Sequence, residues 1–141
     1  GYKAIDSLRL EKGYRVWGSD ITPDDSPHEA GLGFAVRDDK EFIGGAALRE
    51  RGLRRRLRCL VLEDPRSVAL GNEPVRVGGE VAGRVTSGGY GYTVARSIAY
   101  AYLPPEHDVG TAVEVDIFGS WVPGEVAAEP LYDPRGERLR A

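Results

Sequence analysis

The 141-residue sequence contains no methionine, one cysteine and two histidines. The lone Cys59 excludes an intramolecular disulfide framework and a zinc cluster made of several cysteines. The two histidines, His28 and His107, lie far apart in the sequence, which argues against a His-rich metal site. We therefore predict no metal centre, and we expect the protein in a reducing compartment, the cytoplasm.

Long apolar runs are also missing. No stretch approaches the roughly 20 apolar residues that span a bilayer, and the start lacks the basic and apolar regions of a signal peptide. We therefore expect no membrane partner. The chain is 41% hydrophobic and 29% charged, which excludes wholesale disorder. Because native chains begin with methionine unless they are processed, we expect a fragment of a longer protein; the alternative is a mature chain that lost a leader.

Residues 2–12 predict a helix, because apolar side chains recur at the i, i+3 and i+4 spacing of a buried stripe. Gly13 is the expected end of this helix. Residues 18–29 hold two prolines and several Asp and Ser residues, the composition of a structured loop. The residues expected in the buried stripe are Tyr2, Ala4, Ile5 and Leu8.

The short apolar segment 31–36 predicts a strand buried between layers. Residues 40–51 predict a second helix, with Asp38 or Asp39 as its N-cap and Gly52 as its C-cap. These first residues are too few to enclose a core of their own, and an exposed apolar face on them would favour self-association. The side chains expected to point inward from the second helix are Phe42, Ile43, Ala46, Ala47 and Leu48.

From residue 53 onward, short strand-like runs alternate with turn residues. Gly78-Gly79 predicts a two-residue hairpin, and Gly119-Ser120 predicts a second one of type II′. Apolar and polar residues alternate in runs such as EVDIF, as they do in half-buried antiparallel strands. Six strands in about 80 residues favour a small antiparallel barrel or sandwich. The expected strands are 54–63, 74–77, 80–87, 96–103, 111–118 and 121–129.

The sequence therefore predicts an α+β chain in two unequal parts. Residues 1–52 have the alternation of helix and strand found at the end of an α/β domain, and residues 53–141 form an all-β domain that could fold independently. The tail after the last strand contains a Pro-Arg-Gly turn and ends in charged residues, so we expect its final residues to be loose.

A dense group of arginines spans the junction between the two parts. Such a run can follow a phosphate backbone. However, the whole chain has a net charge of -3, and no aromatic residues lie between these arginines to stack on bases. We predict that they form ion pairs within the protein or face solvent, and that nucleic acid is not a partner. The group comprises Arg49, Arg51, Arg54, Arg55, Arg56 and Arg58.

The glycine-rich sequence TSGGYGYT occupies residues 86–93. It is neither a P-loop nor the GxGxxG motif of dinucleotide-binding folds. We favour a tight connection between strands, with Tyr90 and Tyr92 covering one end of a barrel, over a nucleotide-binding loop.

A possible ligand site lies in LRLEKGYRVWGSD, residues 8–20. Glu11 could accept two parallel N–H bonds from a flat heterocycle such as a pterin or guanine, and Tyr14 and Trp17 could supply aromatic surface. The alternative is an ion pair at the end of the helix above an ordinary aromatic core; Arg9 and Glu11 are two positions apart and cannot share one face of the helix. Physical reasoning alone favours this alternative.

Six sequence blocks occur in the order seen in one known family. LRLEKGYRVWGSD, SPHEAGLGFAV, FIGGAAL, RLRCLVL, VAGRVTSGGYGYT and IAYAYL together resemble the C-terminal portion of the glycine-cleavage T-protein (aminomethyltransferase) superfamily. Within it, TSGGYGYT and the tail EPLYDP-G-RLR are most similar to the dimethylglycine and sarcosine oxidases and dehydrogenases. In those flavoproteins a large FAD domain precedes a T-protein-like folate module.

The resemblance implies a fold and a cofactor. Residues 1–52 would be the C-terminal end of an α/β folate-binding domain, and residues 53–141 a small antiparallel six-stranded β-barrel. Tetrahydrofolate would receive a one-carbon unit from a small methylated amine or an aminomethyl donor. FAD, in the flavoprotein branch, would belong to an upstream part of the parent.

The resemblance also implies roles for particular residues. Glu11 matches the glutamate that holds the pterin edge, and Tyr14 and Trp17 would lie near the same cavity. Arg37 or Lys40 would lie near the folate tail. The remaining proposed wall residues are Tyr90 and Tyr92. The acidic catalytic residue of the family would precede Gly1, so we assign no catalytic residue here and expect this piece to be inactive alone.

Two other functions stay open at this stage. One is a stand-alone aminomethyltransferase of the glycine-cleavage type. The other is a non-catalytic structural or interaction barrel. The tRNA-modification and iron–sulfur branches of the superfamily usually carry a K-G-C-Y-x-G-Q-E block, which this sequence lacks.

Overall fold

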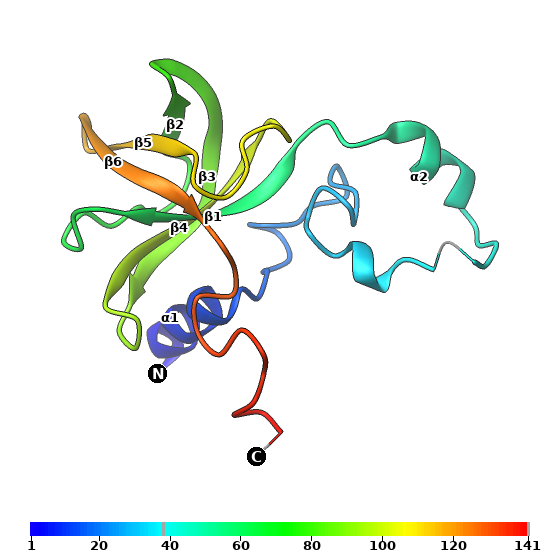
Figure 1. Ribbon diagram of the computed structural model, residues 1–141, viewed down its shortest axis with the longest axis horizontal. Helices are drawn as coiled ribbons and strands as arrows, with labels where there is room; N and C mark the ends of the chain where they lie inside the picture. Colours follow the sequence, from blue (N-terminus) through cyan, green and yellow to red (C-terminus); the bar gives the residue numbers. More distant parts are fainter. Residues whose placement is uncertain (38, 141) are drawn as a thin grey trace.

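The computed structural model describes residues 1–37 and 39–140. Six antiparallel strands close into a barrel in the order β1-β4-β3-β2-β5-β6 (Figure 1). This confirms the predicted six-stranded barrel. Every strand prediction overlaps an observed strand, and the largest difference is β3, which continues four residues beyond its predicted end. The strands are β1 Arg56–Leu62, β2 Pro74–Val77, β3 Glu80–Gly91, β4 Arg96–Leu103, β5 Ala112–Ile117 and β6 Ser120–Ala127.

The barrel interior follows from the alternation of side chains along the strands. In β5, for example, Val113, Val115 and Ile117 are buried, whereas the residues between them are more exposed. These side chains join a single buried cluster inside the barrel, which is rich in β-branched and aliphatic residues. Its members are Leu60, Leu62, Ala69, Val75, Val85, Ala99, Ala101, Leu103, Val113, Val115, Ile117, Val122 and Val126.

Two tight hairpins set the register of neighbouring strands. Gly78 and Gly79 have φ of 59° and 88°, as a type I′ turn between β2 and β3 requires, so the first predicted hairpin is confirmed. The second hairpin turns at Phe118 and Gly119, with φ of 50° and 85°. The predicted type II′ turn at Gly119-Ser120 was therefore wrong, because Ser120 already pairs with Ile117 in the ladder.

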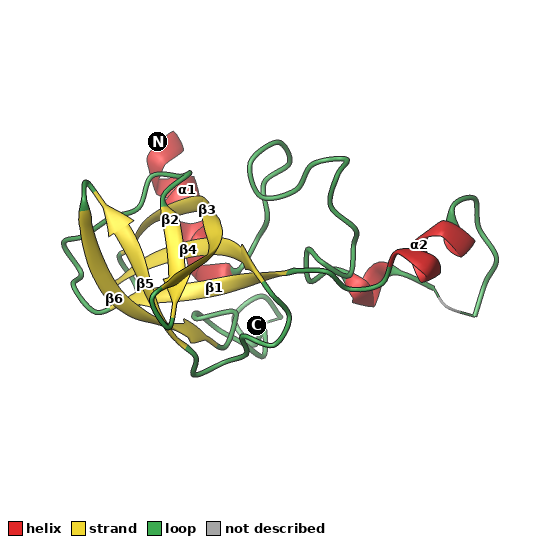
Figure 2. Ribbon diagram, turned by 90° about the horizontal axis from the view of Figure 1, so that it is seen from above, coloured by secondary structure: helices red, strands yellow, loops and turns green. Residues whose placement is uncertain are grey.

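Helix α1 (Tyr2–Lys12) has the predicted bounds and ends at Gly13 in the left-handed region, with φ of 74°. It packs against β3 and β4 on the outside of the barrel (Figure 2). The predicted buried stripe was wrong, since Tyr2, Ala4, Ile5 and Leu8 are all exposed. The helix instead buries Ser7, Leu10 and Glu11, because Ser7 has a hydrogen-bond partner on β3 and Glu11 has one in the β3–β4 turn.

The glycines of β3 allow α1 to lie close to the sheet. A Cβ at Gly89 would be 2.8 Å from Leu10 Cδ1, and one at Gly91 would be 2.9 Å from Glu11 Cγ. Residues 86–91 of TSGGYGYT therefore belong to β3, so the tight connection predicted for them was wrong, and the turn to β4 begins at Tyr92. The glycine-rich motif serves helix–sheet packing in this structure.

Residues 22–55 form an arm that extends away from the barrel (Figures 1 and 2). The predicted strand at 31–36 was wrong: a 3-10 helix, η1 (Gly33–Ala35), occupies it, and Phe34 is exposed. Within residues 1–37 and 39–140, no strand lies next to this segment to pair with it. Helix α2 (Gly45–Arg51) begins five residues later than predicted, with Gly44 as its N-cap and Gly52 as its C-cap. Asp39 is therefore not the N-cap, and Asp38 lies outside the described residues.

The arm also corrects the expected burial of α2. Phe42, Ile43, Ala46 and Ala47 are exposed, because no second layer of structure covers that side of the arm. Leu48 is half-buried. Across residues 1–37 and 39–140, no helix is long and apolar enough to cross a bilayer.

Candidate ligand-binding site

Asp20 joins the loop after α1 to the barrel. Its carboxylate is almost fully buried, and Oδ2 accepts bonds from Arg9 Nη1 at 2.7 Å and from the Val16 N–H at 3.0 Å. Its backbone carbonyl accepts a bond from the Tyr102 hydroxyl at 2.9 Å. These three donors, together with two hydroxyls from β3, hold Asp20 in place. They fix the position of the loop that carries Tyr14 and Trp17.

A β-bulge in β3 supplies the other partners of Asp20. Val85 pairs with Ala101 and Ser87 pairs with Tyr100, so Thr86 is the extra residue. The Thr86 and Ser87 hydroxyls each donate to Asp20 Oδ1 at 2.6 Å. In a regular strand, neighbouring side chains point to opposite faces, so the bulge is what lets both hydroxyls reach one carboxylate oxygen.

Glu11 forms a second link between α1 and β3. Its side chain is buried, and Oε1 accepts the backbone N–H of Thr93 at 2.6 Å and that of Val94 at 3.1 Å. The Ser7 hydroxyl, one turn earlier, donates to the Tyr90 carbonyl at 2.7 Å. The carboxylate thus organises the β3–β4 turn. Ion pairs at the end of the helix, the alternative prediction, also form: Arg9 pairs with Asp20, and Lys12 pairs with Asp133.

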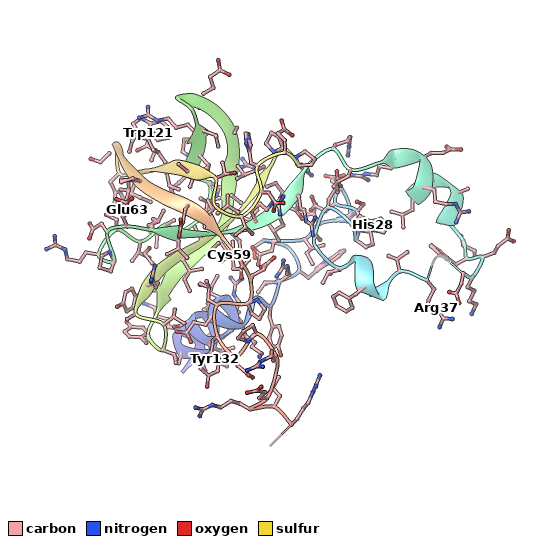
Figure 3. The ribbon with its side chains drawn as sticks, viewed as in Figure 1. His28, Arg37, Cys59, Glu63, Trp121 and Tyr132 are labelled. Atoms are coloured by element: carbon pink, nitrogen blue, oxygen red, sulfur yellow. The ribbon has the colours of Figure 1, made fainter. Side chains whose placement is uncertain are left out.

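A groove of about 360 Å³ runs between α1 and the C-terminal tail; we call it the α1 groove. Its walls are mostly apolar. The loop after α1 contributes the aromatic residue Tyr14, and the C-terminal tail contributes Tyr132, which is labelled in Figure 3. The Tyr132 N–H donates to the Glu11 carbonyl at 3.0 Å, which holds the tail against the helix. The groove is lined by Ile5, Leu8, Arg9, Glu11, Lys12, Tyr14, Tyr132, Asp133, Arg138 and Leu139.

An ion pair between Lys12 and Asp133 closes one side of this groove. Lys12 Nζ lies 3.0 Å from Asp133 Oδ2 and also donates to the Asp133 carbonyl. Burial alone would raise the pKa of Asp133, but the bonds from Lys12 and from the Glu137 and Arg138 N–H groups outweigh it and hold that pKa below its ordinary value.

The structure brings only some of the predicted site residues together. Glu11 and Tyr14 line the α1 groove. Trp17 is exposed on the following loop, and Tyr90 and Tyr92 contact each other edge to face, with ring centroids 5.0 Å apart. Arg37 lies in the arm, away from α1, and forms an exposed ion pair with Asp39 (Figure 3). Lys40 is also exposed in the arm. The ligand roles of all these residues remain predictions.

The arginine group at the junction forms ion pairs inside the chain, as predicted. Arg51 and Arg54 face the fully buried Glu29, and Arg55 pairs with Asp25 at 2.7 Å. Arg58 pairs with Asp108 at 3.2 Å. The pairs of Arg51, Arg54 and Arg55 lie within the arm, and the Arg58 pair joins β1 to the loop between β4 and β5.

Glu29 also closes a capping box with Ser26. The Ser26 N–H donates to Glu29 Oε2 at 2.9 Å, and the Glu29 N–H donates to Ser26 Oγ at 3.2 Å. Burial favours the neutral acid, but the Ser26 bonds and the Arg51 and Arg54 charges outweigh it, so the pKa of Glu29 is lowered.

Cys59 lies beneath α1 on the outer face of β1, in a small cluster with Leu10, Leu57, Ile98 and Tyr100. It is a free, buried thiol (Figure 3). Burial, with the Glu129 carboxylate nearby, raises the pKa of the Cys59 thiol to about 12. A protonated, inaccessible sulfur of this kind is a packing residue rather than a nucleophile.

Comparison with known proteins identifies the family. The glycine cleavage T-protein C-terminal barrel domain matches residues 55–133, which is more than half of the chain, and the GCVT N-terminal domain matches residues 1–40. The chain belongs to the glycine cleavage T-protein family. The resemblance found in the sequence blocks is therefore confirmed.

Two kinds of T-protein relative are similar to this chain. It is 43% identical to 4-methylaminobutanoate oxidase (formaldehyde-forming) of Paenarthrobacter nicotinovorans, over 99% of this chain and 18% of the relative. It is 41% identical to the mitochondrial dimethylglycine dehydrogenase of Rattus norvegicus, over 99% of this chain and 17% of the relative. The crystal structure of the glycine cleavage system aminomethyltransferase T from Bartonella henselae superposes with a TM-score of 0.87 at 31% identity, covering 95% of this chain and 39% of that one.

The chain thus spans less than a fifth of the length of these two oxidoreductases.

Sequence reasoning missed two features of the site in this part of the T-protein fold. Asp20 was predicted only as a loop residue. The aromatic residues before it, Tyr14 and Trp17, were the signal that could have indicated a buried carboxylate at this position. Tyr132 was assigned to the tail after the last strand, and no local signal in the sequence places it against α1.

Proposed function

We propose that the chain is the C-terminal part of the folate module of an FAD-dependent dimethylglycine or sarcosine dehydrogenase. In this proposal residues 1–52 complete a folate-binding domain, and residues 53–141 are its barrel domain. The parent would pass a one-carbon unit from a methylated amine to tetrahydrofolate. The observation that carries the proposal is the identity of 41–43% to two amine oxidoreductases over 99% of the chain.

The α1 groove supports the folate part of the proposal. A pterin is flat, apolar on its faces and rich in N–H donors on one edge. The groove offers mostly apolar walls and two tyrosines, and Glu11, one of its lining residues, has a buried carboxylate. Both described bonds to Glu11 end on Oε1, so Oε2 is the atom that would accept a pterin N–H. The residues present therefore fit this ligand.

The chain's own residues would bind and orient the ligand. Glu11 would hold the pterin edge, Tyr14 and Tyr132 would cover its faces, and Asp20 would keep the loop bearing Tyr14 in place. Tetrahydrofolate supplies the nitrogen atoms that accept the one-carbon unit. FAD would be held by a part of the parent beyond this chain, and no catalytic residue is assigned among residues 1–141.

Calorimetric titration of tetrahydrofolate into the whole parent enzyme tests this proposal. We expect Glu11→Ala to weaken binding by roughly 1.5–3 kcal/mol, the value of a hydrogen bond to a charged group. Because Glu11 also holds the β3–β4 turn, Tyr14→Ala is the companion variant; its side chain is 57% exposed, so its loss should weaken binding without unfolding the protein. Unchanged folate affinity in both variants would overturn the assignment.

A second candidate is a stand-alone aminomethyltransferase, which the superposition with the Bartonella henselae enzyme favours. The two candidates differ in their reactions. A dehydrogenase would reduce an electron-accepting dye when given dimethylglycine or sarcosine, whereas an aminomethyltransferase would not. In the dehydrogenase, added tetrahydrofolate should divert the one-carbon unit from free formaldehyde to 5,10-methylenetetrahydrofolate; formaldehyde release unaffected by tetrahydrofolate would contradict a folate-linked role.

A further inference from the structure

Four arginines line a second hollow surface, separate from the α1 groove. A hollow of about 520 Å³ is lined by Arg51, Arg54 and Arg55, with Pro23 and Asp24. An adjoining hollow of about 370 Å³ shares Arg54 and Arg55 and adds Arg84 from β3. We call the two hollows, with Arg51, Arg54, Arg55 and Arg84, the arginine cleft.

The carboxylates that pair with these arginines lie on the inner side of the cleft. The side chains of Glu29 and Asp25 are 0% and 4% exposed, whereas those of Arg54 and Arg55 are 63% and 42% exposed. Arg54 Nε is 3.5 Å from Glu29 Oε1, a distance too long for a good hydrogen bond. The buried carboxylates therefore anchor the guanidinium groups and leave N–H donors facing solvent.

The charge that faces the solvent is positive. Of the residues lining the two hollows, only Asp24 is acidic. Arg84 is exposed and forms no ion pair among those found in residues 1–37 and 39–140. Guanidinium groups stay charged at all physiological pH values and bind carboxylate or phosphate oxygens in a bidentate manner.

We propose that the arginine cleft binds a small polyanion that carries at least two phosphate or carboxylate groups. Arg51 lines the first hollow and Arg84 lines the second, whereas Arg54 and Arg55 line both. Two anionic groups can therefore be bound at once. Ala82 and Gly83 line the same hollow as Arg84 and add no charge to it.

The same cleft is poorly suited to a nucleic acid. The aromatic ring that lines it, Tyr102, already has the Arg55 guanidinium above it, 4.7 Å from the ring centroid. A base therefore finds no free aromatic face on which to stack. Phosphate and carboxylate ligands share the chemistry that the cleft can recognise, and the experiment below separates them.

Titrations of the 141-residue chain with pyrophosphate, citrate and orthophosphate, followed by calorimetry, test the proposal. We expect pyrophosphate or citrate to bind with one-to-one stoichiometry and more tightly than orthophosphate, because two anionic groups engage both hollows. A preference for pyrophosphate would identify a phosphate ligand, and a preference for citrate a polycarboxylate. Added salt should weaken binding, since the contacts are between exposed charges.

Two variants locate the binding in the cleft. Arg54→Gln and Arg84→Gln remove charges that are exposed, so both should fold, and each should weaken binding of the preferred ion about tenfold, as expected for one charged hydrogen bond. Arg66→Gln is the matched control, because Arg66 is 93% exposed and lies beyond the other end of β1. Absence of binding, or equal loss in the Arg66 variant and the two cleft variants, would overturn the proposal.

Discussion

Glu11 and Thr93 are 82 positions apart in the sequence, yet the Thr93 N–H donates to the Glu11 carboxylate at 2.6 Å. The neighbouring Val94 N–H donates to the same oxygen. This single contact connects the second half of α1 to the β3–β4 turn, and it places the residue with the strongest predicted ligand role at the joint between helix and barrel.

Glu11→Ala should destabilise the chain by about 2–3 kcal/mol, because two turn N–H groups lose their acceptor and one charge-assisted pair of bonds disappears. Urea unfolding followed by circular dichroism measures the change. Glu137→Ala is the control, since Glu137 pairs only with the exposed Arg135 at the surface. Equal midpoints for Glu11→Ala and the wild type would contradict the role given to this contact.

Asp20→Asn should destabilise the chain by about 3 kcal/mol, since it leaves the largely buried Arg9 guanidinium without its close carboxylate partner. Asp6→Asn is a matched control, because Asp6 contacts the same guanidinium at 3.4 Å from an exposed position and should cost less than about 0.5 kcal/mol. Thermal unfolding of the two variants gives the comparison. Similar losses in both would show that burial of Asp20 is not what matters.

The tail should detach from α1 in acid. The folded pKa of Asp133 is lowered, so its contribution to stability is complete above the ordinary carboxyl pKa of about 4 and is lost as the pH falls through the lower, folded value. A pH titration followed by the NMR signals of Tyr132 and Leu139 should show their release in that acidic window. In Asp133→Asn the same signals should report a detached tail already at pH 7; a tail that stays docked in this variant would refute the Lys12 contact as its anchor.

The thiol of Cys59 should not react in the folded protein. Its side chain is 1% exposed and burial raises its pKa to about 12, so at pH 8 it is both inaccessible and protonated. Ellman's reagent should detect no thiol in native protein and one thiol per chain after unfolding in guanidinium chloride. Rapid labelling of the native chain would contradict the packing of α1 over β1.

The barrel could be predicted from the sequence because the patterns that indicate its strands and turns lie within short segments. Strands such as β5 alternate apolar and polar residues, and Gly78-Gly79 marks a hairpin without reference to the rest of the chain. The arm could not be predicted in the same way. Segment 31–36 is apolar, but no strand in the described part of the chain lies beside it, and a strand cannot form without a partner.

Part of the α1 groove was named from the sequence. Glu11 and Tyr14, which both line the groove, were singled out because a carboxylate beside aromatic residues suits a flat hydrogen-bonding ligand, and their ligand roles stay predictions. The face that α1 buries was predicted wrongly, because apolar spacing favoured Ile5 and Leu8, whereas hydrogen bonds to β3 and to the turn after it favour Ser7 and Glu11. Such bonds depend on residues some 80 positions away, and periodicity within the helix contains no information about them.

The central claim, that this chain contributes a folate site between α1 and the C-terminal tail, is tested most directly by NMR. Tetrahydrofolate is titrated into the isotopically labelled 141-residue chain, a method that detects even weak binding. The account predicts saturable shifts concentrated at residues lining the α1 groove, with Tyr14 and Tyr132 among them, and little change in the arm around Arg37. Absence of shifts at millimolar ligand, or shifts confined to other surfaces, would contradict it.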